Sequence, residues 1–407
     1  MSFYLRLLIL SAIILLLEFY FYKRFFGSLK KLAPKLKFIQ SLKFKIPLLI
    51  YQNLYLIIVV IYLITLLIYG GWLSTPPESR LFDYLILYPF WAGIMIIIQS
   101  VIFLLPIDIL RILAKMAVKP KKVIIDRVSD FIVVSMISFF VLYVPIRLYY
   151  DFNVVDVNKI ELDIEDLHPD LKGFKIAFIS DIQADWYTTT NKIANYLNEV
   201  NNLEPDLILI GGDLITSSPQ YIQKSADLLK TLKSQFGVYS TVGDHDNWAY
   251  RDDNDRSRNE IKDALSKYAI NFIDDHNIII PVDSGKIGIS FITDTYSKRI
   301  SNEKLTDLTN SLSADFKIML AHQPVQKIID KASSKNYNLM LAGHTHGGQI
   351  TFLFPFVYLG PTLIETNYVR GEFWFGDLLM YVNRGLGVSL APIRYNSTPE
   401  VTLFILK

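Results

Sequence analysis

Two histidines that lie two positions apart, His344 and His346, are the residues of this sequence whose types and spacing most directly suggest chemistry. They follow the short apolar run 338–342, which is typical of a buried strand, and Gly343 lets the chain turn between them and that strand. Neutral imidazoles at this spacing can serve two adjacent metal ions, because imidazole binds zinc, iron, manganese and similar ions. An H-x-H pair alone is equally compatible with two solvated loop histidines. The remainder of the chain decides between these interpretations.

Four other apolar runs also end in residues that can bind a metal or transfer a proton. They are the predicted strands 175–180, 206–210, 237–242 and 317–321, and amphipathic segments at 191–202 and 220–234 lie between some of them. The residues that follow these strands are Asp181, Gln183, Asp213, Asp244, His245, Asp246 and His322. Each has an ordinary alternative as a turn former, helix cap or core histidine. Because side chains at the carboxyl ends of strands in an α/β sheet converge on one crevice, five coinciding strand ends favour a shared site for two divalent ions.

The order of these residues carries a family resemblance. The set consists of Asp181-x-Gln183, Gly212-Asp213, Gly243-Asp244-His245-Asp246, His322 and Gly343-His344-x-His346. It resembles the calcineurin-like metallophosphoesterase superfamily, over residues 173–407. The tail Asn383-Arg384-Gly385-Leu386-Gly387 with Pro392-Ile393-Arg394 is similar to a bacterial branch whose members are membrane-bound or exported. The resemblance implies a four-layer α/β/β/α sandwich with a two-metal centre.

The resemblance also implies a role for each residue. One ion would be held by Asp181, Asp213 and His346, and the other by Asp213, Asp244, His322 and His344, so that Asp213 bridges the two. A water between the ions would be the nucleophile, because metal coordination lowers the pKa of water towards neutrality, and the ions would offset the charge that develops on the phosphate. His245 would polarise the phosphate or protonate the leaving group. Asp246 would orient His245, or cap a helix.

Two positions depart from the family pattern, which has His in place of Gln183 and Asn in place of Asp244. Glutamine offers a carbonyl oxygen, which is a weaker ligand for borderline metals than imidazole, whereas Asp244 adds a full negative charge to the second site. We therefore expect the site of Asp181 to bind its ion less tightly, or to prefer an oxygen-loving ion such as Mn²⁺ or Mg²⁺. The candidate ions are Mn, Fe, Zn and Mg. Asp185 is a candidate substitute ligand, or else a solvated loop aspartate.

The first 150 residues differ in composition from the rest. The chain is 51% hydrophobic and 20% charged, which is too apolar for a soluble protein of 407 residues. Residues 1–150 hold 17 of the 41 basic and 6 of the 39 acidic residues, so this part is basic and residues 151–407 are acidic. An acidic second part argues against a nucleic acid partner. The absence of cysteine excludes disulfides and thiolate zinc sites.

Four apolar segments in this first part, roughly 3–22, 47–73, 84–105 and 131–149, are each near the length of about 20 residues that crosses a bilayer as a helix. Buried core helices are the alternative. We predict a four-helix transmembrane region at 1–150, a lead-in strand and linker at 151–172 and a metallophosphoesterase domain at 173–407. By the positive-inside rule, the basic loops 23–45 and 111–130 are expected in the cytoplasm. The sequence therefore predicts a multi-pass cell-membrane protein with an extracytoplasmic catalytic domain. Glu18 and Asp108 are expected near the membrane interface.

Three hypotheses for function follow. The first is a membrane-anchored, metal-dependent phosphoesterase that acts on a phosphate ester or pyrophosphate of a small molecule, a lipid or another envelope component. The second is a degenerate member in which Gln183 has disabled one site and the fold binds a phosphorylated ligand as a sensor or regulator. The third is a transporter or channel subunit, against which the few charges within the apolar segments argue.

The remaining candidates are weaker. His168 and His276 have no motif around them and are expected at the surface. Arg384 and Arg394 either pair with a phosphate or form ordinary structural ion pairs. Aromatic side chains alternate at 352, 354, 356 and 358, and this pattern indicates either a hydrophobic lip for a lipid tail or, as the preferred interpretation, one buried face of a strand.

Overall fold

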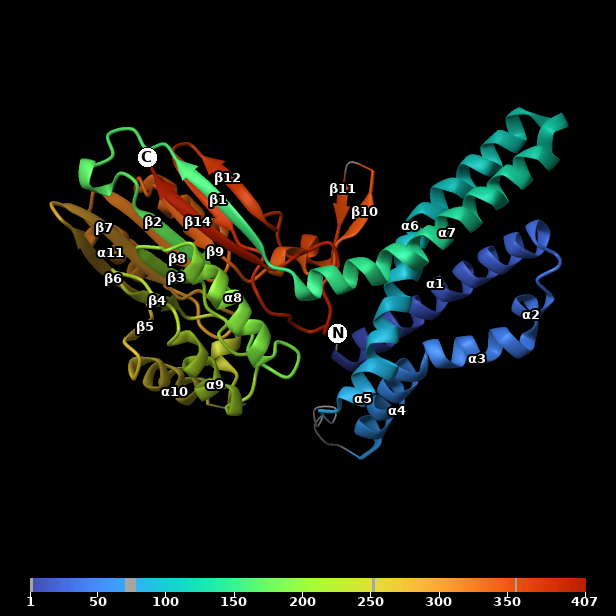
Figure 1. Cartoon of the computed structure of the whole chain (residues 1–407), viewed down its shortest axis with the longest axis horizontal. Helices are drawn as coiled ribbons and strands as arrows, with labels where there is room; N and C mark the ends of the chain where they lie inside the picture. The colour runs from blue at the N-terminus through green and yellow to red at the C-terminus, as the bar shows by residue number, and fades with distance from the viewer. Residues whose placement is uncertain (1–2, 70–77, 251–252, 356) are drawn as a thin grey trace. The chain divides into compact units, whose positions relative to one another are not determined.

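Figure 1 shows the computed structural model of the chain, which describes residues 3–69, 78–250, 253–355 and 357–407. These residues divide into two compact units. The first unit contains the chain up to Tyr149 together with Phe352–Leu359, and the second contains Tyr150–Thr351 and Gly360–Lys407. The end of the second apolar segment, 70–73, and the aromatic residue Phe356 lie outside the described residues.

Apart from one hairpin, the first unit is helical. Its helices are α1 (Phe3–Leu32), α2 (Lys37–Gln40), α3 (Leu42–Gln52), α4 (Leu54–Tyr69), α5 (Arg80–Phe82), α6 (Tyr88–Ala117) and α7 (Lys122–Asn153), the last of which continues into the second unit. Among the described residues, the stretches Arg80–Ala117 and Lys119–Asn153 are long and apolar enough to cross a membrane, and a third span results if the bent pair Leu42–Gln52 and Leu54–Ile61 is one span. The predicted helical character of this part is therefore confirmed, and it contains two candidate spans. Four spans stay a prediction, since the first predicted segment forms part of α1, which is not among the candidates.

Buried polar contacts join the helices of the first unit. Arg24 of α1 pairs with Asp108 of α6 and with Asp130 of α7, each at 2.8 Å. Glu18 is buried and accepts a hydrogen bond from Asn53 at 2.7 Å. Asp108 thus has a partner on a neighbouring helix and Glu18 one at the break between α3 and α4, which lowers the cost of placing charges among apolar segments.

A two-stranded hairpin packs on α6 within the first unit. It consists of β10 (Phe352–Phe354) and β11 (Val357–Leu359), which pair antiparallel. The buried side chain of Gln99 in α6 donates to the carbonyl of Leu353 at 2.8 Å and accepts from its amide at 2.9 Å. Phe352 is buried, whereas Phe354 and Tyr358 are exposed. The preferred interpretation of the aromatic alternation as one buried strand face is therefore wrong for these two residues, because the chain reverses between them.

Two six-stranded mixed sheets form the second unit. The first sheet has the order β1 (Asp156–Leu162), β14 (Glu400–Leu406), β2 (Lys175–Ile179), β3 (Leu207–Ile210), β4 (Val238–Thr241), β5 (Ile270–Ile273). The second has the order β12 (Gly371–Phe375), β13 (Leu378–Val382), β9 (Leu339–Ala342), β8 (Phe316–Ala321), β7 (Gly285–Ile292), β6 (His276–Val282). Strands β2 to β5 run parallel in one sheet, and β7, β8, β9 and β13 do so in the other. The five predicted strands are confirmed as β2, β3, β4, β8 and β9.

The segment predicted as a lead-in strand and linker contains strand β1, which pairs in parallel with β14 from Asp156 opposite Glu400 to Leu162 opposite Leu406. The first sheet is thereby extended by a strand that precedes the predicted domain. Residues 156–162 therefore belong to the sheet, whatever the role of the segments on either side of them.

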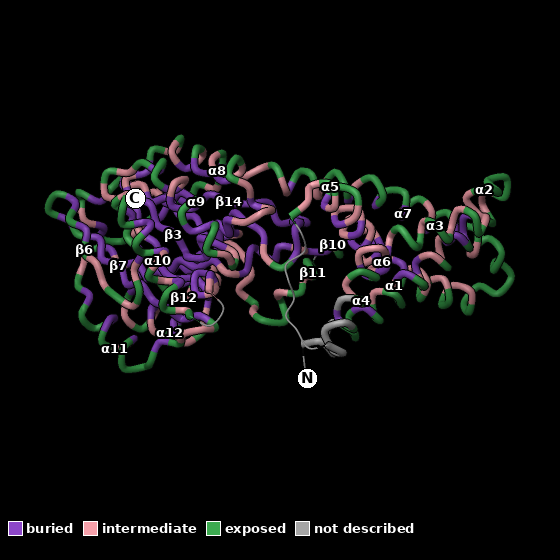
Figure 2. Tube along the Cα trace, turned by 90° about the horizontal axis from the view of Figure 1, so that it is seen from below, coloured by how far each residue is buried: buried purple, intermediate pink, exposed green. Residues whose placement is uncertain are grey.

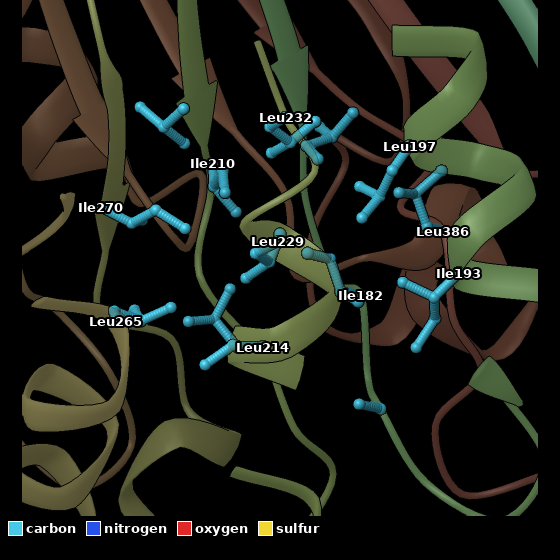
Figure 3. Close-up of a cluster of buried hydrophobic side chains, with 14 of the residues drawn as sticks. Ile182, Ile193, Leu197, Ile210, Leu214, Leu229, Leu232, Leu265, Ile270 and Leu386 are labelled. Carbon is cyan, nitrogen blue, oxygen red and sulfur yellow. The ribbon is translucent and has the colours of Figure 1, made fainter. Parts of the chain in front are cut away.

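Helices cover the outer faces of the sheets. Helices α8 (Thr190–Asn202), α9 (Gln220–Leu229) and α10 (Asn254–Ser266) bury one apolar face on the first sheet, and Figure 3 shows Ile193, Leu197, Leu229 and Leu265 gathered with Ile210 and Ile270 of the sheet. Helices α11 (Asn302–Ser311) and α12 (Gln326–Ser334) share a core with β8, β9 and β13. A further core contains residues of both sheets, including Phe178 and Leu320. The central strands are apolar on both faces for this reason, and Figure 2 shows their trace as buried.

Candidate metal centre

The carboxyl ends of β2, β3, β4, β8 and β9 bring together the residues that the sequence singled out. Six of them form two groups, Asp181 with Asp213 and His346, and Asp244 with His322 and His344. Within each group the candidate ligand atoms all lie within 4.8 Å of one another. These are the two sets of ligands that the family resemblance implied, apart from the sharing of Asp213.

Asp213 lies between the two groups. Its Oδ2 is 3.3 Å from Nε2 of His322, and that nitrogen is 3.4 Å from Oδ2 of Asp244. On the other side, Nε2 of His346 is 3.5 Å from Oδ1 of Asp181. A carboxylate that reaches ligands of both groups is placed as a bridging ligand would be.

Two buried atoms that could coordinate a metal ion support the fit of this site to metal. Among the described residues, Oε1 of Gln183 and Nε2 of His322 have no hydrogen-bond partner. The amide nitrogen of Gln183 donates to Oδ2 of Asp213 at 2.8 Å, which leaves its carbonyl oxygen without a partner. A buried acceptor of this kind costs about 1–3 kcal/mol, and a cation would satisfy it. The donor set of carboxylate, imidazole and amide oxygen, without sulfur, suits Mn, Fe, Zn or Mg.

The backbone at these residues is unusual. Asp181, Gln183, Asp213, His344 and His346 adopt left-handed conformations, with φ of 51°, 48°, 56°, 70° and 50°. Non-glycine residues rarely adopt this conformation, and it concentrates at functional sites. The strand ends therefore turn sharply enough to direct consecutive polar side chains into one site.

Two glycines allow the strand ends to approach each other. A Cβ on Gly343 would lie 1.8 Å from the hydroxyl of Ser180, and a Cβ on Gly243 would lie 2.2 Å from the amide nitrogen of Asp213. Neither distance is compatible with a side chain. These positions therefore require glycine for close approach of the loops after β2, β3, β4 and β9.

Hydrogen bonds outside the two groups orient the imidazoles. Nδ1 of His322 lies 2.7 Å from the carbonyl oxygen of Gly211, and Nε2 of His344 lies 2.9 Å from the carboxylate of Glu365. The hydroxyl of Tyr296 also donates to Glu365. Such partners fix the ring orientation of metal-binding histidines. Sequence reasoning missed Glu365 and Tyr296, because both lie in loops without a motif or a periodic pattern.

His245 lies beside the groups. Its backbone amide donates to Asp213 at 2.8 Å, its Nδ1 contacts the carbonyl oxygen of Thr216, and its Nε2 is 3.2 Å from the hydroxyl of Ser389. The ring also packs edge-on against Trp248, with the centroids 4.7 Å apart. One ring nitrogen is thus held by backbone and the other is directed to a hydroxyl.

Asp246 is buried beneath the loops. Its carboxylate accepts hydrogen bonds from the amides of Gly243, Asp213 and Leu214 at 2.8, 2.9 and 2.8 Å. In the described part of the chain, the partner of Nδ1 of His245 is the carbonyl of Thr216, and no hydrogen bond joins His245 to Asp246. That Asp246 orients His245 stays a prediction. The structure does show that Asp246 holds the backbone of the two loops that carry Asp213 and Asp244.

Burial and neighbouring charges separate the protonation of the two groups. Burial, reinforced by the charge of Arg394, lowers the pKa of His346 to about 4. For His344, burial is outweighed by the carboxylates of Asp244 and Glu365, which raise its pKa to about 9. Burial and the charge of Asp213 raise the pKa of Asp246 to about 7. At neutral pH and without an ion, therefore, the imidazole of His346 is neutral and that of His344 carries an extra proton.

The remaining candidates have structural partners. Asp185 accepts hydrogen bonds from the amides of Tyr187 and Thr188 at 2.7 and 2.6 Å, as a turn former does. His168 and His276 are not buried, as expected.

The two arginines are also structural. Arg384 pairs with Glu400 at 2.5 Å and with Asp156 at 3.1 Å. Arg394 is only 1% exposed and donates to four backbone carbonyls, those of His346, Arg384, Gly387 and Ser397. Of the two interpretations that the sequence left open, the structure therefore supports the structural ion pair for Arg384. Arg394 is structural in a different way from the one expected, because it bonds to backbone carbonyls.

Comparison with known proteins adds to this geometry. A family model described as calcineurin-like phosphoesterase matches residues 174–348. The chain is 31% identical over 239 residues to the uncharacterised metallophosphoesterase YkuE of Bacillus subtilis, which spans 58% of this chain and 79% of that protein. It is 27% identical over 281 residues to the uncharacterised metallophosphoesterase Cj0846 of Campylobacter jejuni, and the match spans 67% of this chain and 68% of that protein. It is 28% identical over 262 residues to a transmembrane protein with metallophosphoesterase domain of Bos taurus, and the match spans 62% of this chain and 57% of that protein. The residues matched by the family model include both ligand groups, Gln183, His245 and Asp246.

Proposed function

This chain belongs to the calcineurin-like phosphoesterase family, and on that premise we propose that it is a membrane-anchored, metal-dependent phosphoesterase. It would hydrolyse a phosphate ester or pyrophosphate of a small molecule or lipid, with a water between two divalent ions as the nucleophile and with the ions offsetting the charge on the phosphate. The observation that carries the proposal is the pair of ligand groups that meet at Asp213. The three cores on and between the two sheets support the four-layer α/β/β/α arrangement that the resemblance implied.

Each side chain has a role in this proposal. Asp181, Asp213 and His346 hold one ion, and Asp213, Asp244, His322 and His344 hold the other. Gln183 contributes its unpartnered carbonyl oxygen to the first site. Glu365 holds the ring of His344 from the side opposite Asp244, since the two carboxylates lie 2.9 Å from different ring nitrogens.

His245 is the candidate for proton transfer to the leaving group. Because the carbonyl of Thr216 can only accept a hydrogen bond, it fixes a proton on Nδ1 of His245. Nε2 is then the atom that exchanges a proton with the leaving oxygen, and Ser389 lies within reach of it at 3.2 Å. Asp246 supports this arrangement through the amides of the loops that carry Asp213 and Asp244.

The membrane setting completes the proposal. The candidate spans and the transmembrane relative support membrane association. The basic loops of the first unit favour a multi-pass topology in which the phosphoesterase unit faces away from the cytoplasm.

The proposal is tested by metal content and turnover on one sample. The full chain, purified in detergent, is analysed for bound metal and assayed against an aryl phosphate with added Mn²⁺. We expect two ions per chain and a loss of turnover in Asp213→Ala and His245→Ala, while Asp263→Ala, an exposed aspartate on α10, keeps parent activity. One ion or none, without turnover of monoester or diester probes, would contradict the proposal and leave the non-catalytic ligand-binding hypothesis.

Gln183 permits a sharper test of the first site. His is compatible with the left-handed backbone at this position, where φ is 48°. Because imidazole is the stronger ligand for borderline metals, Gln183→His should tighten binding of Zn²⁺ at the first site by about tenfold or more and leave the second site unchanged. Isothermal titration of both proteins measures this. Identical isotherms would show that residue 183 does not face the ion.

A further inference from the structure

Exposed apolar and aromatic side chains surround the candidate metal centre within the second unit. They are Tyr296, Leu363, Ile364 and Leu390, which we call the apolar rim. Ile364 is 93% exposed and Leu390 is fully exposed, and Tyr296 and Leu363 are about half exposed. Single exposed apolar side chains are common on protein surfaces, but each of these four either contacts His344 or lies within two residues of a residue that contacts His344 or His245.

One side of the apolar rim lies next to the second ligand group. The ring of Tyr296 packs edge-on against His344, with the centroids 5.5 Å apart, and its backbone amide donates to Asp244 at 2.6 Å. Leu363 and Ile364 end the 3₁₀ turn Pro361–Ile364 and directly precede Glu365, the partner of His344. These side chains therefore border the site where the second ion would bind.

The other side of the apolar rim lies next to His245. Leu390 follows Ser389, whose hydroxyl is 3.2 Å from Nε2 of His245. The leucine has a φ of 62°, which is rare for a residue with a bulky side chain. Gln349 holds its loop by donating to the carbonyls of Ser389 and Ala391 at 2.9 Å each. A strained backbone, fixed by a buried amide, thus presents an apolar side chain to solvent beside the group that would protonate the leaving oxygen.

The chain itself indicates which apolar partner meets this rim. The hairpin β10–β11 begins six residues after His346 and ends six residues before Glu365, so it is inserted between two residues of the metal centre. That hairpin belongs to the helical unit and is tied to α6, part of a candidate membrane span, by both hydrogen bonds of Gln99. Its residues Val357 and Leu359 are exposed and apolar. The segment that leads to the rim is therefore attached to the helical unit that contains the candidate membrane spans.

We propose that the substrate is a lipid phosphate, an amphipathic phosphate ester whose phosphate enters the metal centre while its hydrocarbon chain lies on the apolar rim. This inference rests on the proposed function. A small polar ester would leave the rim in water, whereas a hydrocarbon chain removes Ile364, Leu363 and Leu390 from water as the ester reaches His245.

The test compares hydrocarbon chain lengths on the full chain in detergent with Mn²⁺. An aryl phosphate first establishes whether monoesters or diesters are hydrolysed, and short-chain and long-chain alkyl phosphates of that class are then compared below their micelle concentrations. We expect kcat/KM to be about tenfold higher for the long chain. The double variant Leu363→Ser with Ile364→Ser, and independently Leu390→Asn, should remove most of this preference and keep aryl phosphate turnover. Asparagine suits the left-handed backbone of residue 390.

Ile279→Ser is the matched control, because Ile279 is 51% exposed in the middle of β6, opposite Gly288 and away from the strand ends that carry the ligands. It should keep both the chain-length preference and the turnover. Absence of turnover with every probe would overturn the proposed function itself. Aryl phosphate turnover without a chain-length preference, or with a preference that the rim variants do not change, would overturn the lipid inference alone. Equal loss of aryl and alkyl turnover in the rim variants would also overturn it, since those residues would then support the metal centre and not the hydrocarbon chain.

Discussion

Arg394 offers a direct test of how the loop that bears His346 is held in place. Its guanidinium is buried, and it donates to the carbonyl oxygens of His346, Arg384, Gly387 and Ser397 at distances between 2.6 and 3.2 Å. Burial lowers the pKa of Arg394 to about 10, so the side chain is still charged at neutral pH. We predict that Arg394→Met, which keeps the length of the side chain and removes the donors, destabilises the second unit.

The magnitude follows from the acceptors that lose a donor. The carbonyl of His346 keeps the hydroxyl of Ser397, at 2.7 Å, and the carbonyl of Gly387 keeps Nδ1 of His346, at 3.4 Å, whereas the carbonyls of Arg384 and Ser397 lose the guanidinium. Each buried acceptor without a donor costs about 1–3 kcal/mol, and the methionine regains part of this because it removes a buried charge. We therefore expect a loss of about 2 kcal/mol in the free energy of unfolding, taking the low end for both carbonyls. For a unit of this size, the loss lowers the melting temperature by about 4–8 °C.

Thermal unfolding of the full chain in detergent, together with aryl phosphate kinetics, measures the effect. Arg256→Met is the control, since Arg256 is an exposed arginine on α10 that pairs with Glu260, and its removal should leave the melting temperature nearly unchanged. If Arg394→Met kept the melting temperature of the parent while KM rose about tenfold, Arg394 would be a phosphate ligand and the structural assignment would be refuted.

Two further predictions concern metal binding. In the metal-free protein His344 has a pKa of about 9. Despite its burial, His322 also has a pKa well above its usual value, because the carboxylates of Asp213 and Asp244 raise it. An ion that binds with Asp244, His322 and His344 must displace the protons of these imidazoles, so the affinity of this second site should rise by at least about tenfold for each pH unit up to about pH 9 and fall as the pH is lowered. The first site contains His346, with a pKa of about 4, and the metal affinity of this site should change little above neutral pH. Titration calorimetry in buffers of different protonation enthalpy measures how the affinity of each site depends on pH. Equal pH dependence at the two sites would contradict this reasoning. Glu365→Ala removes the acceptor from Nε2 of His344 and should lower the metal affinity of the second site by about 10–100-fold, with that of the first site unchanged. Glu365→Gln keeps an acceptor and should lose less affinity. Competition with a chelator measures the affinities, and equal losses in both variants would show that the hydrogen bond is unimportant.

The candidate ligands could be predicted from the sequence for a local reason. Strands β2, β3, β8 and β9 are mostly buried on both faces, so each is a short apolar run that is followed by polar residues, whereas β4 is largely buried but mixes apolar with polar side chains. Because parallel strands end at the same edge of a sheet, the residues after β2, β3 and β4 had to meet, and so had those after β8 and β9. The packing of the two sheets then brings these two sets together. Asp181, Asp213, Asp244, His322 and His344 were therefore accessible from pattern alone.

Other features depend on contacts between distant parts of the chain. The pairing of β1 with β14 joins Asp156 to Glu400, and no local pattern in either segment identifies the other. The aromatic alternation at 352–358 was assigned to one strand face, but a reversal of the chain makes it a hairpin that packs on α6. Hydrophobic periodicity gives the type of an element but not its partner.

The sequence by itself determined the kind of chemistry, because residue types and their positions at the ends of apolar runs are local properties. Only the tertiary structure decided what each polar group does. It placed Glu365 on His344, enclosed Arg394 among backbone carbonyls, and gave Asp246 three amides to accept from. The physical reason is that a buried polar group must find its partner wherever the fold supplies one, and that partner is set by geometry and not by distance along the chain.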